Sequence, residues 1–211
     1  MFIIQVIVMP ICKKKKVLFI HVPKCAGTSI AKSLNIYSET NFPANMDILY
    51  GIHDNIVLQS LCLEYYNNYI KDDLNDFTIL TCVRNPYERV LSDYKWCDRG
   101  FTNILDFCKF IKTTLKRKKK CDFMLFDSKY YINHLLPQYE YINNTSLKVN
   151  ILHMENINEE FNKLFPATIL CHENKTQHVD YVSFFKDKEE CINIINEIYK
   201  IDFEKFGYDM L

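Results

Sequence analysis

The residues best suited to chemistry near the start of the chain are Lys24 and the small residues that follow it, in the sequence PKCAGTS at 23–29. Gly27 permits a close backbone approach, and Thr28 and Ser29 are suited to open a helix whose free N–H groups attract an anion. Lys24 adds a positive charge at the same place. An ordinary turn with an exposed lysine has a similar sequence, so a second motif is needed to decide.

Arg84 and Ser92 form that second motif. Arg84 follows an apolar run, and Ser92 lies about two helical turns further on. A guanidinium and a hydroxyl at this spacing can converge on one anion. Taken singly, Arg84 is equally typical of a structural ion pair, and Ser92 of a solvated helix surface. Two such sites in one chain favour anion binding as the interpretation of both.

Each motif follows an apolar run that is typical of a buried strand, at residues 17–20 and 77–83. In the second motif Asn85 is suited to cap a helix, and Pro86 suits the first helical position. Glu88 is placed to complete an N-x-x-E capping box. The chemistry-bearing residues are therefore expected where strands end and helices begin.

The remaining elements are predicted from hydrophobic spacing and capping signals. Helices are expected at 56–70, 86–96, 103–115 and 187–200, and an Asp-x-x-Glu box from Asp187 is expected to cap the last of them. Strands are expected at 148–153 and 167–171, and an added edge strand or flexible segment within 1–16. A loop over the site is expected at 37–47. This alternation predicts an α/β fold with a central parallel sheet flanked by helices, in three layers, with ligand at the carboxyl ends of the strands.

The two motifs resemble those of the sulfotransferases that use PAPS (3′-phosphoadenosine 5′-phosphosulfate), in the branch of heparan sulfate 2-O-sulfotransferase and the carbohydrate sulfotransferases. HVPKCAGTSI at 21–30 is similar to that family's 5′-phosphosulfate loop, and VRNPYERVLSDY at 83–94 to its 3′-phosphate motif. Further similar stretches are GIHDN, HLLPQYEYI, ILHMENI, HENKTQH and DFEKFGYDM. The resemblance covers nearly all of the chain after Lys16.

The resemblance implies a sulfotransferase fold similar to that of the P-loop nucleotide-binding enzymes, in a single domain over 1–211. It also implies PAPS as donor, PAP as product, no metal, and an acceptor hydroxyl for which a carbohydrate is favoured. The donor-binding residues that it implies are Lys24, Cys25, Ala26, Gly27, Thr28, Ser29, Arg84, Ser92, Asn174, Lys175, Thr176 and His178, and the acceptor-binding residues are His134 and Gln138. Cys25 stands where the family often has threonine, so a hydroxyl contact to phosphate would be lost there.

Two catalytic roles also follow from the resemblance. Lys24 is expected to stabilise the leaving phosphate. His53 is expected to be the general base, because the family's base lies between the two motifs and His53 is the only histidine between Lys24 and Arg84. His134, His178 and Glu39 are the alternatives for that base.

Composition limits the function classes. The chain has 26 Lys and Arg and 26 Asp and Glu, so its net charge is zero and no general attraction to nucleic acid or membrane surfaces follows. The nine cysteines form no C-x-x-C pair, which favours a reducing compartment. Residues 2–11 are apolar but too short to span a bilayer and lack a signal peptide's pattern. We expect a soluble cytoplasmic protein, with the secretory pathway left open.

Two other functions stay open at this point. A nucleotide-dependent kinase also binds phosphates, although the pattern G-x-x-x-x-G-K-[ST] is absent from this chain. An inactive PAPS- or PAP-binding protein would carry the same two motifs without turnover. The basic run at 116–120 is typical of a solvated turn, with a contact to an anionic glycan as the alternative.

Overall fold

The computed structural model describes residues 10–36, 52–53, 55–68, 73–96, 99–125, 127, 129–171 and 180–211. Its main sheet has the strand order β1 (Ile11–Cys12), β2 (Val17–Ile20), β5 (Thr78–Val83) and β6 (Val149–His153). β2, β5 and β6 run parallel, and β1 pairs antiparallel with β2. A separate two-stranded sheet is formed by β3 (Ile52–His53) and β4 (Ile56–Val57).

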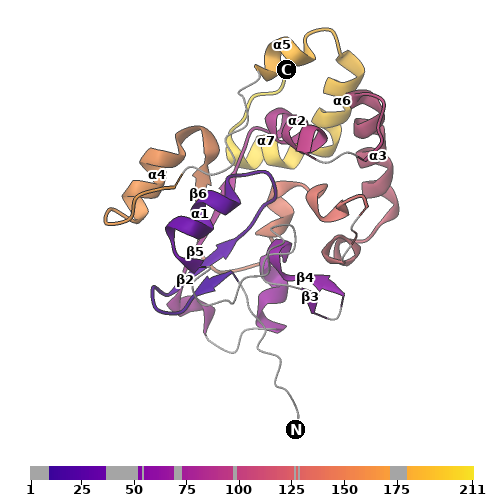
Figure 1. The fold of residues 1–211 in the computed structure, drawn as a ribbon. Coiled ribbons are helices and arrows are strands. Elements are labelled where there is room, and N and C mark those ends of the chain that lie inside the picture. Colours follow the sequence, from indigo (N-terminus) through magenta and orange to yellow (C-terminus); the bar gives the residue numbers. More distant parts are fainter. Residues whose placement is uncertain are drawn as a thin grey trace.

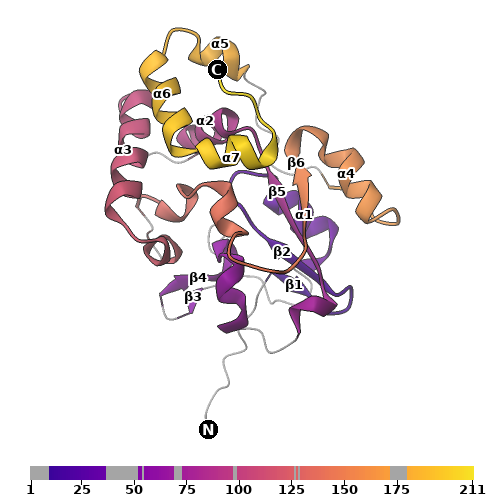
Figure 2. The same cartoon turned by 180° about the vertical axis from the view of Figure 1, so that it is seen from behind.

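Helices flank the main sheet. They are α1 (Gly27–Ser33), α2 (Pro86–Trp96), α3 (Ile104–Arg117), α4 (Ile157–Leu164), α5 (Tyr181–Phe185), α6 (Glu189–Ile198) and α7 (Lys200–Phe206). Short 3-10 segments lie at Leu58–Ser60, Leu63–Asn68, Leu74–Asp76, Lys120–Met124, Ile132–His134, Gln138–Tyr141 and Met154–Asn156. Figures 1 and 2 show α1 and α4 on one side of the sheet and α2, α3, α6 and α7 on the other. The expected α/β fold with a mostly parallel central sheet is confirmed.

The two inner strands are the ones that carry the chemistry-bearing motifs. Every residue of β2 is buried, and β5 is buried after its exposed first residue, Thr78. The Thr81 hydroxyl donates to the Ile20 carbonyl at 2.8 Å, which adds a side-chain bond to the ladder between these strands. β6 is an edge strand in which only Leu152 is fully buried. The ends of β2 and β5 therefore lie side by side in the most rigid part of the sheet.

The start of α2 is capped in a way that the sequence predicts only in part. Asn85 caps the helix as expected, since its side-chain oxygen accepts from the Tyr87 N–H at 3.0 Å. The expected capping box is wrong. The Asn85 N–H donates to Glu155, which comes just after β6, at 2.9 Å, and Glu88 pairs with Arg84 instead. Glu155, which follows the neighbouring strand β6, therefore accepts the hydrogen bond that the capping-box motif assigns to Glu88.

Three further expectations about the elements are wrong. Of the expected helix at 56–70, the described residues 56–68 do not form an α-helix, because β4 forms a bridge with Leu125 and extended backbone at Leu61 separates two 3-10 segments. Residues 167–171 form no strand: Ile169 is 88% exposed, whereas its neighbour Leu170 is buried in the core. The last helix begins at Glu189 without a side-chain cap and is followed by a second helix, so Asp187 does not open it.

The edge-strand expectation is confirmed at one place only, where Ile11 and Cys12 pair with β2. Residues 2–9 and the expected loop at 37–47 lie outside the described residues. α3 begins where expected, with the Asn103 side chain accepting from the Asp106 N–H at 3.0 Å. Within the part of the chain that the structure describes, no helix combines the length and apolar character needed to cross a bilayer.

Candidate active site

The turn after β2 has an unusual backbone. Lys24 and Ala26 both adopt left-handed conformations, with φ of 68° and 55°, on either side of Cys25. Side-chain-bearing residues adopt this region rarely, and turns that alternate in hand bring successive N–H groups to one concave side, where they attract anions. α1 begins directly after this turn, at Gly27. The backbone conformation of this turn, like its sequence, is therefore suited to hold an anion, as an anion cradle.

Gly27 is required by a side chain as well as by a ligand. A Cβ at this position would lie 2.0 Å from Nε2 of His21. The His21 ring is stacked on Phe19 at 5.6 Å and bonded through Nδ1 to the Gln59 amide at 3.0 Å. Burial, helped by the nearby positive charge of Lys24 and by His134, lowers the pKa of His21 to about 3, so the ring is neutral. His21 is therefore a neutral side chain that packs beneath the loop, a role that no local pattern in the sequence indicates.

The side chain of Gln138 joins the two motifs. Its Oε1 accepts from the Arg84 N–H at 2.9 Å and from the Cys25 thiol at 3.2 Å, and its Nε2 donates to the Arg84 carbonyl at 2.8 Å. Gln138 has no exposed surface, and its own N–H donates to Asp202 at 2.8 Å. This burial does not support the expected contact of Gln138 with an acceptor. The buried Cys25 thiol likewise faces Gln138, so only the backbone of Cys25 is suited to hold a phosphate.

Arg84 lies at the end of β5, next to the Lys24 turn in the sheet. Its Nε donates to Glu88 at 3.0 Å, and its side chain is 14% exposed. Within the described ranges no contact joins Arg84 to Ser92, which is half-buried on α2. Burial and the positive charges of Arg84 and Arg99 lower the pKa of Lys24 to about 8, against the opposing effect of Asp93. The two cations that the sequence singled out are thus close enough to repel each other.

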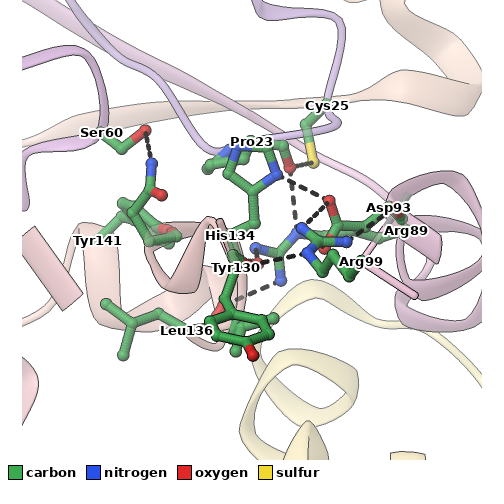
Figure 3. A network of polar contacts seen from close by, with 12 residues as sticks. Pro23, Cys25, Ser60, Arg89, Asp93, Arg99, Tyr130, His134, Leu136 and Tyr141 are labelled. Atoms are coloured by element: carbon green, nitrogen blue, oxygen red, sulfur yellow. Dashed lines mark hydrogen bonds and ion pairs between the residues drawn. The ribbon is translucent and has the colours of Figure 1, made fainter. Parts of the chain in front are cut away.

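Lys24 also belongs to a cluster that the sequence did not predict. Its ammonium lies 4.6 Å from the ring centroid of Trp96, and the His134 ring stacks on the same indole at 4.9 Å. The His134 Nδ1 lies 2.7 Å from Asp93, whose two oxygens accept from Arg99 at 3.2 and 3.1 Å. Figure 3 shows the imidazole of His134 between Asp93 and the Pro23–Cys25 turn. The structure therefore brings His134, an acceptor-binding candidate of the sequence analysis, to the Lys24 loop, with Trp96, Asp93 and Arg99 around it.

The charges in this cluster determine two protonation states. Burial alone would raise the pKa of Asp93, but His134, Arg99 and Arg89 outweigh it and lower that pKa to about 2. Burial lowers the pKa of His134 below the ordinary value of 6.5, and it outweighs the Asp93 carboxylate, which acts in the opposite direction. At neutral pH the pair is therefore a carboxylate beside a neutral imidazole.

The remaining expected site residues fall into two groups. Thr28 and the buried Ser29 lie in the first turn of α1, at the cradle. The backbone of His53 lies in β3, but its side chain is outside the described residues, so the structure does not test it as a base. Glu39, Asn174, Lys175, Thr176 and His178 also lie outside the described residues.

A protein-family model described as the sulfotransferase family matches residues 9–209. The chain belongs to the sulfotransferase family. No curated protein and no solved structure matches it. In this sulfotransferase the Lys24 ammonium, the left-handed turn and the Arg84 guanidinium form a donor set suited to two anionic groups, and all three stand at the carboxyl ends of β2 and β5, where parallel sheets bind ligands. The described residues therefore fit a ligand that carries two separate anionic groups.

Proposed function

We propose that this sulfotransferase moves the sulfuryl group of PAPS to a hydroxyl group of a carbohydrate. The observation that carries the proposal is the meeting of the Lys24 turn and the Arg84 strand end at neighbouring parallel strands, with the Gln138 amide bonded to both. PAPS carries a phosphosulfate and, at a fixed distance, a 3′-phosphate. Two cationic places held in one rigid frame suit such a ligand better than a single phosphate site does.

Each motif has its own role in donor binding. Residues 24–29 hold the phosphosulfate through backbone N–H groups and the Lys24 ammonium, while Arg84 and Ser92 hold the 3′-phosphate. The Glu88 carboxylate orients the Arg84 guanidinium through Nε, and no described residue bonds its terminal nitrogens. Those nitrogens are therefore suited to a phosphate. The segment 174–178, outside the described residues, remains a predicted part of the nucleotide site.

Lys24 acts on the bond that breaks. When bound, PAPS supplies the sulfuryl group, and negative charge grows on the bridging oxygen as this group leaves. An ammonium at that oxygen stabilises the transition state more than the ground state. With a pKa of about 8, Lys24 is mostly protonated at neutral pH. The indole of Trp96 beside it is 40% exposed, so part of its apolar surface is open to an acceptor sugar.

The acceptor hydroxyl must lose its proton during attack, and a neutral imidazole within hydrogen-bond reach is suited to take it. His53 is the residue that the sequence predicts for this role, and it remains a prediction. His134 is the second candidate, and it is the one whose side chain the structure describes beside Lys24.

The proposal is tested by transfer of radiolabelled sulfate from PAPS to a panel of glycans, a tyrosine peptide and a simple phenol, with and without EDTA. We expect label on a glycan and no need for Mg²⁺. Label on the peptide or phenol alone would refute the carbohydrate acceptor. Transfer of the γ-phosphate of ATP that needs Mg²⁺ would make the protein a kinase. PAP binding in calorimetry with no transfer to any acceptor would make it a binding protein.

A further inference from the structure

We propose that His134, oriented by Asp93, is the residue that accepts the proton of the attacking hydroxyl in this site. This inference rests on the proposed sulfuryl transfer and specifies one residue within it. Four features of the described structure carry it: the tautomer of the imidazole, its free nitrogen, its neighbours and its fixed position.

The tautomer of His134 is determined by its partner. An ionised carboxylate only accepts hydrogen bonds, so the proton of the neutral ring lies on Nδ1, 2.7 Å from Asp93. Nε2 then carries a lone pair. A carboxylate on Nδ1 also stabilises the imidazolium that forms when Nε2 takes a proton, as in the Ser-His-Asp arrangement of hydrolases.

The free nitrogen has no structural use that the described residues reveal. Among them, none bonds Nε2 of His134, and the side chain keeps 12% of its surface exposed. Asp93 does not need His134 for charge compensation, because Arg99 already binds both of its oxygens. His153, a histidine outside the site, differs in that both of its ring nitrogens have partners, Glu160 and the Phe206 carbonyl.

The position of the ring is fixed from two sides. Arg89 donates to the His134 carbonyl at 2.7 Å and to the Pro23 carbonyl at 3.1 Å, so one buried guanidinium ties the histidine to the turn that carries Lys24. The imidazole stacks on Trp96, over which the Lys24 ammonium also lies. The group that takes the proton and the group that stabilises the leaving oxygen thus share one aromatic side chain.

The charges that face the ring keep it ready to accept a proton. Asp93 and Arg99 face it from α2 and the residues after it, and Lys24 and His21 from the end of β2 and the turn that follows. Burial has the largest effect on the ring, and together with these charges it keeps the pKa of His134 below 6.5. The other described histidine near Lys24, His21, is no alternative base, because its Nε2 packs against Gly27 and its pKa is about 3.

The proton of the acceptor hydroxyl moves to Nε2 of His134 while the acceptor oxygen forms its bond to sulfur. The bond between sulfur and the phosphate oxygen breaks, and its electron pair stays on that oxygen, beside Lys24. The imidazolium later gives its proton to water, with Asp93 still bonded to Nδ1.

The experiment compares His134→Gln, His53→Gln and Asp93→Asn with His153→Gln, the same change at a histidine outside the site. We expect His134→Gln to lower kcat about 10²–10⁴-fold and by more than His53→Gln does, with PAP affinity within about twofold of the parent. His153→Gln should match the parent. If His134→Gln keeps the parent kcat, or if only His53→Gln abolishes turnover, the inference is wrong.

A measurement on the parent protein without any ligand guards against misfolded variants. ¹⁵N NMR of the imidazoles should show one ring protonated on Nδ1, titrating below pH 6.5, whose signal disappears in His134→Gln. In Asp93→Asn the same ring should change tautomer or titrate at lower pH. A His134 protonated on Nε2 in the parent would overturn the inference. Failure of the parent to bind PAP or transfer sulfate would instead refute the proposed function, so the two failures are distinguishable.

Discussion

Replacing Gly27 by alanine should destabilise the protein through His21. The added Cβ would lie 2.0 Å from Nε2 of the His21 ring, whereas ordinary van der Waals contact begins at 3.4 Å. The ring must therefore move by about 1.4 Å, the difference between these distances. Phe19 on one side and the Gln59 amide on the other oppose this movement.

Two destabilising effects and one stabilising effect determine how much Gly27→Ala changes the free energy of unfolding. Overpacking of this kind costs about 1–3 kcal/mol, and loss of the hydrogen bond between His21 and Gln59 adds about 1 kcal/mol. Alanine is favoured over glycine inside a helix by about 1 kcal/mol, but Gly27 is only the first residue of α1, so this gain is partial. We expect a net loss of about 1–3 kcal/mol in the free energy of unfolding.

A double-mutant cycle tests whether His21 is the cause. Urea unfolding gives the free energy for the parent, Gly27→Ala, His21→Ala and the double variant. With the ring removed, Gly27→Ala should be neutral or slightly stabilising. If it costs as much in the His21→Ala background as in the parent, the clash with the ring is not the reason for the glycine. His21→Val provides the same comparison if His21→Ala is too unstable to measure.

Three further predictions concern donor binding, catalysis and stability. Arg84→Ala should weaken PAP binding about tenfold or more in calorimetry, with little change for AMP, which lacks the 3′-phosphate; equal affinity of the parent for PAP and AMP would contradict this. Lys24→Ala should lower kcat about 10²-fold or more. In the parent, kcat/KM should fall as pH rises through about 8, because Lys24 then loses its charge; a flat profile up to pH 9 together with an unchanged kcat in the variant would leave Lys24 without this role. Asp202→Ala should lower Tm by roughly 5–10 °C, because the N–H groups of Gln138 and Tyr139 lose their buried acceptor; an unchanged Tm would mean that water replaces it.

The elements that the sequence predicts well are those with local signals. The run at 17–20 is buried on both faces, and the Asn85 and Asn103 caps place the starts of α2 and α3. Residues 56–70 have an equally helical apolar pattern, yet they form β4 and 3-10 segments because Ile56 pairs with His53 and with Leu125 far along the chain. Tertiary pairing outweighs a local preference of a few tenths of a kcal/mol per residue.

The residues of the candidate site also fall into those that a local sequence signal indicates and those that it does not. Lys24 and Arg84 were predicted because each belongs to a contiguous motif that ends a strand. Asp93 lies inside the second motif, but its partner is 41 residues away, so no local pattern indicates an Asp–His pair. Trp96 and Arg99 acquire their roles only when α2 lies beside the turn after β2. Such partners follow from the packing of elements, which spacing along the chain does not specify.

The departure from the family at Cys25 has a physical explanation in the bond to Gln138. The Cys25 thiol donates to the amide oxygen that also accepts from the Arg84 N–H, so its side chain is turned away from the cradle and toward the second motif. This side chain therefore supplies no contact to the cradle, and the N–H groups suited to an anion are those of the left-handed turn at Lys24 and Ala26. What the thiol contributes is a link between the two anion sites. In the proposed function one ligand must reach both sites, so the distance between them must be fixed. Gln138, buried and bonded to both strand ends, is the side chain that fixes it.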